Sequence, residues 1–442
     1  MARLTLALRL AACAAQVAAA SASPARAQVP ATPPDSLRLG ALQRQAAAAD
    51  PRLRQFTLLT RQTDLRLRNL SAEWLPAFQI EGQAQYQSDV FDAASLPVGT
   101  PFPTPARDTY DARLSVEQAI LDLTIGPRRS VERARLAESE AEVRSALHAR
   151  RHEVNEAFFA AALLAERGRI VAATIGELES RLREAAARVR EGTALPGDTA
   201  AVRATLLERF QDSAEIEANR RAAWLRLGEL IKQPLADSVA LAMPNLTAET
   251  DHARGALPSL RVHPEYERLA RVRDRLAYQE AAVSAAVRPR VSAFGRLGYG
   301  RPGLNPIGGR FDTYYVVGVH VRWAPWTWGR TGREREALAV QREIVATQEE
   351  TLAGDLTRAI QGDLADADRL EAVLALDDRI VALRDQVENE TRLRFQEGVV
   401  TAAEFLDRST DALEARLARA THRVQHVRAR ARLLTTLGVE IR

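Results

Sequence analysis

Residues 338–387 read LAVQREIVATQEETLAGDLTRAIQGDLADADRLEAVLALDDRIVALRDQV, and this stretch decides the fold. Every seventh position is apolar, with one aspartate as the exception: Leu338, Val345, Leu352, Ala359, Asp366, Val373, Ile380 and Val387. A seven-residue period held over so many turns predicts a long helix that supercoils against neighbouring helices. The helical pattern covers about residues 330–396, which corresponds to about 100 Å at 1.5 Å per residue. We therefore expect an extended molecule rather than a compact domain.

The same pattern occurs once before, over about residues 127–190, and the positions around the two helices match in order. Two prolines 25 residues apart are followed ten residues later by a tyrosine in each half: Pro51, Pro76 and Tyr86, then Pro264, Pro289 and Tyr299. A glycine follows each long helix, and an acidic residue lies six positions beyond it: Gly192 and Asp198, then Gly398 and Glu404. This ordered series predicts a two-fold internal repeat.

Two segments before each long helix alternate apolar with polar residues. They cover about residues 77–87 and 108–118 in the first copy, and 290–299 and 312–323 in the second. Such alternation predicts four strands, each with one apolar and one polar face. A strand of about ten residues suits a tilted crossing of a lipid bilayer.

Helical patterns resume after each glycine, over residues 198–231 and 401–437, and predict two return helices. Between the copies, three prolines and a glycine interrupt the pattern, so we expect residues 233–261 to form a linker at the equator of the molecule. The predicted units are therefore a first structural repeat, 28–232, this linker, and a second structural repeat, 262–442.

The first residues are typical of an exported protein. Arg3 supplies a positive charge, an apolar stretch follows, and Ala25-Arg26-Ala27 fits a cleavage site, so residues 1–27 are predicted to be a signal peptide. A second interpretation stays open, because Leu10-Ala11-Ala12-Cys13 resembles a lipobox that would leave Cys13 lipidated. Cys13 is the only cysteine, so no disulfide is expected in the exported body.

The charge balance argues against nucleic acid as a partner. Of 442 residues, 61 are basic and 57 acidic, which leaves a net charge of only +4. The two signs are interleaved, whereas a nucleic-acid-binding face needs clustered positive charge. After the leader no run of about 18 apolar residues occurs, so no transmembrane helix is expected.

No group of residues suggests catalysis, so we expect neither an enzyme nor a cofactor. Two pairs of histidines lie four positions apart on predicted helices and could share a metal ion: His148 and His152, then His422 and His426. Arginines crowd both pairs, and no zincin motif is present. We therefore expect surface histidines and no metal site.

A strand pair, a long helix, a glycine and a return helix, occurring twice behind a signal peptide, resemble the TolC family of outer-membrane efflux channels. The segment Val319-His320-Val321-Arg322-Trp323-Ala324-Pro325, leading to Gly329-Arg330, adds to the resemblance, which extends from Ser36 to Gly438. It implies a mostly α fold with membrane β structure. Three protomers would each give four strands to one twelve-stranded barrel, continued by a long α-helical barrel in the periplasm.

The resemblance also implies a function, a location and partners. The function is the exit duct of a tripartite efflux or type I secretion system in the outer membrane, reaching into the periplasm. The partners are two further copies, outer-membrane lipid, a periplasmic adaptor (membrane fusion) protein, and an inner-membrane pump of the RND or ABC type. The alternative is a periplasmic coiled-coil adaptor or scaffold without a barrel, against which the four amphipathic strands argue.

Two groups of site residues follow from the resemblance. Glu404 and Asp407 correspond to an acidic pair that narrows the periplasmic mouth, and three copies would make a negative ring. The open alternative is that they are solvated charges on one helix face. The hairpin tips, marked by Gly192, Asp198 and Gly398, would dock the adaptor.

Three tryptophans cluster where the last strand meets the second long helix: Trp323, Trp326 and Trp328. Indole rings favour the level of the lipid headgroups, so an interfacial aromatic belt is expected. Ordinary packing at the base of the barrel is the alternative.

Overall fold

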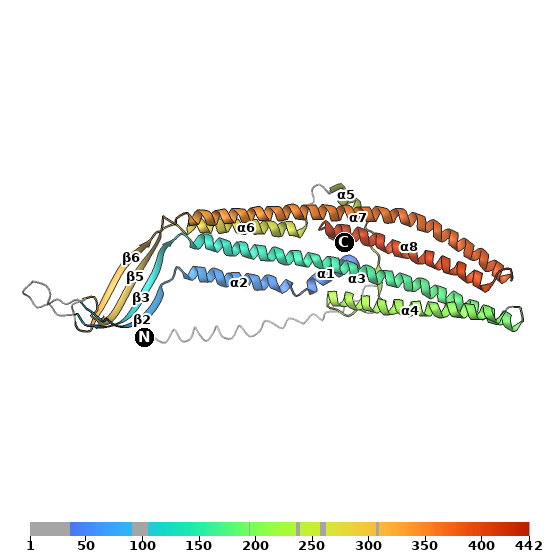
Figure 1. Ribbon diagram of the computed structural model, residues 1–442, viewed down its shortest axis with the longest axis horizontal. Coiled ribbons are helices and arrows are strands. Elements are labelled where there is room, and N and C mark those ends of the chain that lie inside the picture. The colour runs from blue at the N-terminus through green and yellow to red at the C-terminus, as the bar shows by residue number, and fades with distance from the viewer. Residues whose placement is uncertain are drawn as a thin grey trace, which may run out of the picture.

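The computed structural model describes residues 36–90, 105–193, 195–235, 239–256, 262–305 and 309–441. The molecule is elongated, with a β-sheet at one end and helix hairpins that end in two tips at the other (Figure 1). The predicted signal peptide, 1–27, and Cys13 lie outside the described residues. No helix among the described residues is both long enough and apolar enough to span a membrane.

Four strands form one antiparallel sheet in the order β2-β3-β5-β6. Their bounds are Ala77–Tyr86 for β2, Asp108–Asp122 for β3, Arg290–Arg301 for β5 and Asp312–Arg322 for β6. Strand β3 runs beyond its expected end at residue 118, and its register with β5 shifts between Ala119 and Leu121. Within the described chain, β2 and β6 each have one strand neighbour and are the edges of the sheet.

The two faces of the sheet differ in chemistry, as the alternation predicts. One cross-strand row consists of Ile80, Leu114, Leu297 and Tyr315, which are 87%, 40%, 58% and 74% exposed. The row beside it, on the opposite face, consists of Glu81, Arg113, Gly298 and Tyr314. The sheet therefore exposes one apolar face and one polar face.

A glycine on the polar face makes room for an aromatic ring. A Cβ atom at Gly298 would overlap the ring of Tyr314. Because this position has no side chain, the Tyr314 hydroxyl reaches across β5 and donates to Asp111 Oδ1 at 2.6 Å. On the same face, Arg113 Nε donates to Glu81 Oε2 at 2.7 Å. These contacts join β6 to β3 across β5, and β3 to β2.

Each strand pair continues into a long helix that folds back into a return helix. The long helices are α3, Ile125–Arg190, and α7, Arg330–Gln396. The return helices are α4, Pro196–Ile231, and α8, Ala402–Thr436. With 66 residues, α3 is about 99 Å long at 1.5 Å per residue. The order strand, strand, long helix, return helix thus occurs twice along the chain.

Helices α2 and α6 lie beside the long helices in the half of the molecule that is next to the sheet (Figure 1). Helix α6, Pro264–Ala285, lies between the two long helices. Arg144 of α3 pairs with Glu267 of α6 at 3.0 Å, and Leu276 of α6 belongs to an apolar cluster with Leu338 of α7. Helix α2, Leu53–Ala72, packs on the same part of α3.

The largest apolar core lies near the middle of the long axis of the molecule, which we call the equator. Strand β1, Ser36–Arg38, pairs in parallel with β4, Ala240–Ala242, beside α1, Leu39–Ala49, and α5, Thr247–Ala256. The largest side chains of this core come from four elements: Leu39, Leu42, Phe158, Phe159, Trp224, Leu227, Leu433 and Leu434. The prolines and the glycine of this segment predict only a linker, whereas residues 240–256 contain a strand and a helix.

The seven-residue series of α7 does not pack as one continuous seam within the chain. Leu338 and Val345 are buried against α6. Below the equator, where α7 packs on α8, the buried residues lie on another face: Asp363, Ala367, Leu370, Asp377, Val381 and Glu388. Ile380 and Val387 of the series are 48% and 40% exposed. The lower part of the series therefore faces outward in the single chain.

Candidate functional site

The two hairpin tips are built in the same way. Gly192 and Gly398 have φ angles of +74° and +76°, a region that glycine enters without a steric penalty. After each glycine, the next amide closes a Schellman motif. Thr193 N donates to Arg188 O, and Val399 N donates to Arg394 O, both at 2.9 Å. The glycines identified by spacing are thus the residues that end α3 and α7.

The acidic residues that follow the tips differ in their local contacts. Asp198 Oδ2 accepts from the amide of Leu195 at 3.2 Å, so Asp198 stabilises the start of α4. At the start of α8, Thr401 Oγ1 accepts from the amide of Glu404 at 3.2 Å. The Glu404 carboxylate is therefore not needed as the cap.

Glu404 and Asp407 lie three residues apart in the first two turns of α8, and both are exposed. Neither carboxylate makes an ion pair or a side-chain hydrogen bond with any residue that the structure describes. Between them, Phe405 and Leu406 are buried. The structure therefore brings the two acidic residues together on the outside of hairpin α7/α8 and leaves their charges free.

An arginine of one tip is bound to the other tip. Arg188 of α3 donates from Nη1 to Phe395 O at 3.0 Å and from Nη2 to Gln396 O, both in the last turn of α7. Its guanidinium also lies 5.7 Å from the centre of the Phe395 ring, which stacks on Phe405 at 5.5 Å. This contact could not be expected from the sequence, because an arginine in the last turn of a helix is usually solvated.

Ion pairs join α7 to α8 along their length. Three acidic residues of α7 are less than one-tenth exposed, namely Asp363, Asp377 and Glu388. Arg416 of α8 binds Glu388 and Asp385 at 2.7 Å each, and His422 Nδ1 lies 2.7 Å from Asp377. The hairpin is therefore held together by buried ion pairs in addition to apolar contacts, such as those of Leu370 with Ala429.

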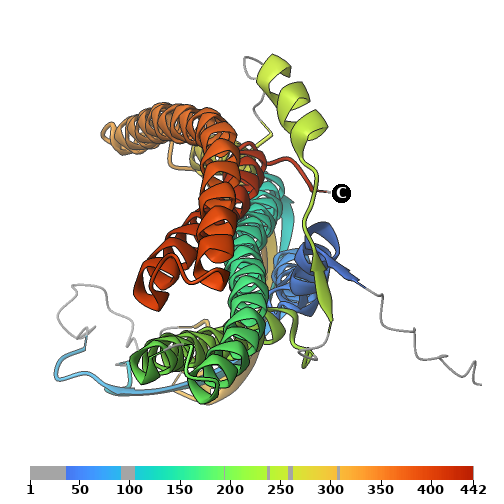
Figure 2. The ribbon, with the colours of Figure 1, turned by 90° about the vertical axis from the view of Figure 1, so that its right-hand side faces the viewer.

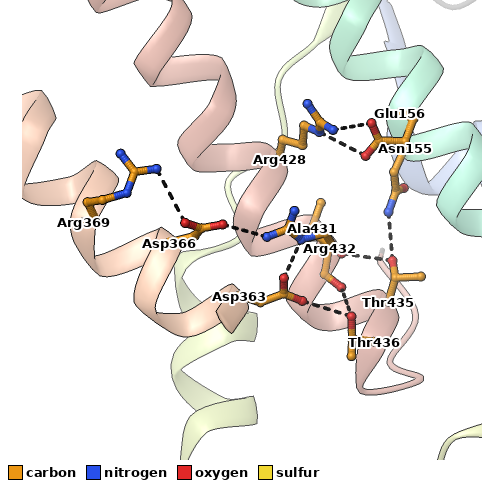
Figure 3. Close-up of polar contacts among 10 residues, drawn as sticks. All are labelled: Asn155, Glu156, Asp363, Asp366, Arg369, Arg428, Ala431, Arg432, Thr435 and Thr436. Atoms are coloured by element: carbon orange, nitrogen blue, oxygen red, sulfur yellow. Dashed lines mark hydrogen bonds and ion pairs between the residues drawn. The ribbon is translucent and has the colours of Figure 1, made fainter. Parts of the chain in front are cut away.

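Figure 3 shows the equatorial end of this interface. Arg432 of α8 binds Asp363 through Nε and binds Asp366 through Nη2 at 2.9 Å. Thr436 donates to the second oxygen of Asp363 at 3.0 Å. Burial works against the charge of Arg432, but Asp363 and Asp366 still raise its pKa above the ordinary value. We call Arg432, Asp363 and Asp366 the equatorial clamp.

The opposite side of α8 is bound to α3. Arg428 Nε donates to Glu156 Oε1 at 3.0 Å (Figure 3). Asn155 Nδ2 donates to Thr435 Oγ1 at 2.8 Å, and Gln43 of α1 donates to Asn155 Oδ1 at 2.6 Å. Helix α8 thus connects hairpin α7/α8 to hairpin α3/α4, and the two hairpins lie side by side when viewed from the tips (Figure 2).

One histidine belongs to this buried polar group. His148 Nε2 donates to Thr435 O at 3.0 Å, and its ring lies 5.0 Å from that of His263. The expectation of surface histidines is therefore wrong for His148, which is only 9% exposed because α3 packs there on α8. Among the described residues, no three histidines, cysteines or acidic residues are placed to share a metal ion.

Stability will depend on pH through His148. Burial, then His263 and Arg151, lowers its pKa from 6.5 to about 4. The unfolded chain therefore binds more protons between these values, so stability is full above pH 6.5 and falls toward pH 4, by up to about 1.4 kcal/mol per pH unit. We expect urea unfolding at pH 7 and pH 5 to show a larger loss for wild type than for His148→Gln. Equal losses would contradict this role of His148.

The three tryptophans lie between β6 and α7. Trp323, Trp326 and Trp328 are 61%, 73% and 82% exposed, and the rings of Trp326 and Trp328 meet edge-to-face at 5.9 Å. In the single chain their rings are exposed at the junction of sheet and helices and are not packed into a core.

The comparisons with known proteins agree with this architecture. No protein-family model matches the sequence, and no curated protein matches it by sequence. Among solved structures, CusC, studied for folding and transmembrane channel formation, has a TM-score of 0.67 at 16% identity over 91% of this chain and 92% of its own. The outer-membrane channel OprN has 0.66 at 17% identity, over 90% and 89%. The outer membrane protein VceC from Vibrio cholerae has 0.65 at 15% identity, over 91% and 97%. The chain therefore has the fold of the TolC-like outer-membrane channels, as its sequence predicts.

Proposed function

We propose that the chain is one protomer of a homotrimeric outer-membrane channel, the exit duct of a tripartite efflux or type I secretion system. The observation that carries this proposal is the sheet. Four strands expose an apolar face on one side and a polar face on the other, and two edges stay unpaired within the described chain. In water, such a sheet leaves its apolar face exposed. In lipid, its two edges leave backbone N–H and C=O groups without hydrogen-bond partners.

Three copies supply what one copy lacks. Pairing β6 of one copy with β2 of the next removes all edges and gives a closed barrel of twelve strands. The apolar row with Ile80 and Tyr315 then faces lipid, and the polar row with Glu81 and Arg113 faces a water-filled lumen. In this arrangement Trp323, Trp326 and Trp328 lie at the membrane surface as an aromatic belt.

The helices suggest the same closure. Within the chain, α3 packs on α8, the return helix of the other hairpin. Their counterparts in the order of elements, α7 and α4, are left at the two outer sides and carry exposed apolar residues: Leu376, Ile380 and Leu383 on α7, and Leu207 and Phe210 on α4. Pairing α7 of one copy with α4 of the next closes a periplasmic tunnel below the barrel.

In this proposal each structural repeat, 28–232 and 262–442, gives one hairpin to the barrel and one to the tunnel, and residues 233–261 form the belt between them. The protein is a passive duct and not an enzyme. An adaptor docks on the tips near Gly192, Asp198 and Gly398, and an inner-membrane RND or ABC pump delivers the substrate. Glu404 and Asp407 line the periplasmic mouth.

The test is the mass of the purified protein. Light scattering of the detergent-solubilised protein should give three copies per particle. A monodisperse monomer that stays soluble without detergent would overturn the proposal and would favour the alternative, a periplasmic coiled-coil scaffold.

Neutralising the acidic pair should change ion selectivity. In the trimer, Glu404 and Asp407 form a negative ring that attracts cations. We expect Glu404→Gln with Asp407→Asn to lower the preference for cations over anions, measured as a reversal potential across a salt gradient. The matched control is Glu336→Gln with Glu343→Gln, two exposed charges of α7 far from the tip. If both double variants keep the wild-type potential, the acidic pair does not line the mouth.

A further inference from the structure

The two tips correspond residue by residue. Gly192 and Gly398 are 206 positions apart, and the same offset relates Arg188 to Arg394. Both arginines lie four residues before the glycine, and the carbonyl of each accepts the amide that closes its Schellman motif. The two side chains therefore leave equivalent points at the ends of α3 and α7.

Only one of the two arginines is used within the chain. The Arg188 guanidinium spans Phe395 O and Gln396 O, at the negative end of the α7 dipole. The Arg394 side chain is exposed and makes no hydrogen bond, ion pair or ring contact with the residues that the structure describes. A planar guanidinium that can bind two carbonyls is thus left without a partner.

The face that leads to Arg394 is also unpartnered. On α3, positions 174, 181 and 188 face the other hairpin: Thr174 is buried, and the Arg181 guanidinium lies 5.6 Å from the centre of the Phe405 ring. The same offset places Ile380, Val387 and Arg394 on α7, where the two apolar residues are 48% and 40% exposed. The face of α7 with Ile380, Val387 and Arg394 therefore corresponds to the face of α3 that contacts the other hairpin, but it has no partner within the chain.

We infer that Arg394 is a clamp between protomers, which donates to the backbone carbonyls of Val189 and Arg190 at the end of α3 in a second copy. These residues are the counterparts of Phe395 and Gln396 at the 206-residue offset. Arg190 turns its own Nε back to Ala186 O at 3.3 Å, away from the following turn. Three Arg188 contacts within chains and three Arg394 contacts between chains then alternate around the mouth and hold the six tips together. This inference rests on the proposed trimer.

Cross-linking tests the contact directly. Arg394→Cys with Arg190→Cys, treated with a short bis-maleimide, should give covalent dimers and trimers on a denaturing gel. Arg392→Cys with Arg190→Cys is the matched control, because residue 392 lies on the opposite side of the same turn and should give monomers. The parent chain, whose only cysteine is Cys13, should also give monomers. If the protein is a trimer by light scattering but the 394/190 pair gives only monomers, the clamp is wrong and the proposed function stands. If no trimer forms, the proposed function itself fails.

Conductance tests what the clamp does. We expect Arg188→Gln and Arg394→Gln each to raise the mean current through the channel severalfold, since each variant frees tips at the mouth that the remaining contacts cannot hold together alone. Arg379→Gln removes the same charge from an exposed position higher on α7 and should leave the current unchanged. A current for Arg394→Gln equal to that of Arg379→Gln would show that Arg394 is an ordinary solvated residue.

Discussion

Replacing Arg432 with methionine should lower the free energy of unfolding by about 3 kcal/mol, the low end for breaking a buried ion pair. Asp363 is 7% exposed, and the substitution leaves its charge buried with Thr436 as the remaining partner. The Arg432 side chain is one-third exposed, which is why the low end applies. Urea unfolding in detergent, followed by circular dichroism, measures the difference.

Two further variants separate the ion pair from the packing around it. Arg369 binds only the outer carboxylate, Asp366, at 3.5 Å and is 59% exposed, so Arg369→Met should cost less than about 1 kcal/mol. Removing both charges with Arg432→Met and Asp363→Leu should recover most of the loss, because no unpaired charge remains. An Arg432→Met chain as stable as Arg369→Met would mean that the equatorial clamp contributes nothing.

Truncating Phe158 to alanine should cost about 3–5 kcal/mol, the range measured for buried aromatic residues. Phe158 is fully buried in the equatorial core and meets Phe159 edge-to-face at 5.2 Å. Tyr278→Ala on α6 is the control, since that ring is 47% exposed. The shift of the urea midpoint for Phe158→Ala should therefore be several times that for Tyr278→Ala. Similar shifts would place the stabilising core elsewhere.

The strands and the ends of the long helices can be predicted from the sequence because their residue patterns are periodic or occur twice. Alternation around Ile80 and Glu81 gives a strand with two different faces, and the structure has that strand. The glycines at 192 and 398 mark the ends of the long helices, since a left-handed residue after a helix is costly for any other side chain. A period of two or seven residues involves only residues that are close together in the chain, so it can be recognised in a single sequence.

The contacts between helices and between strands could not be predicted in the same way. Asp363, Asp377 and Glu388 read as surface residues of α7, yet all three are buried because arginine or histidine side chains of α8 reach them. Their arginine and histidine partners lie 28 to 69 residues away along the chain, and no pattern in the sequence of α7 predicts them. The pairing of β1 with β4 joins three-residue strands about 200 residues apart, too short to give a periodic signal.

The candidate site likewise has a part that could be predicted from the sequence and a part that could not. The helical pattern from residue 401 predicts that Glu404 and Asp407, which the family resemblance singles out, lie in the first turns of the return helix, and the structure has them there with unpaired carboxylates. The Arg188 contact with the other tip could not be predicted, because it depends on how two hairpins 206 residues apart are set side by side. The aperture role of the acidic pair remains a prediction.

The central claim is that three copies of this chain enclose one continuous pore, and single-channel recording in planar bilayers tests it most directly. Purified protein added to one side of the membrane should produce discrete, uniform current steps that grow with salt concentration, because the lumen is lined by the polar face of the sheet. An absence of steps from protein that is folded and trimeric in detergent would contradict the claim.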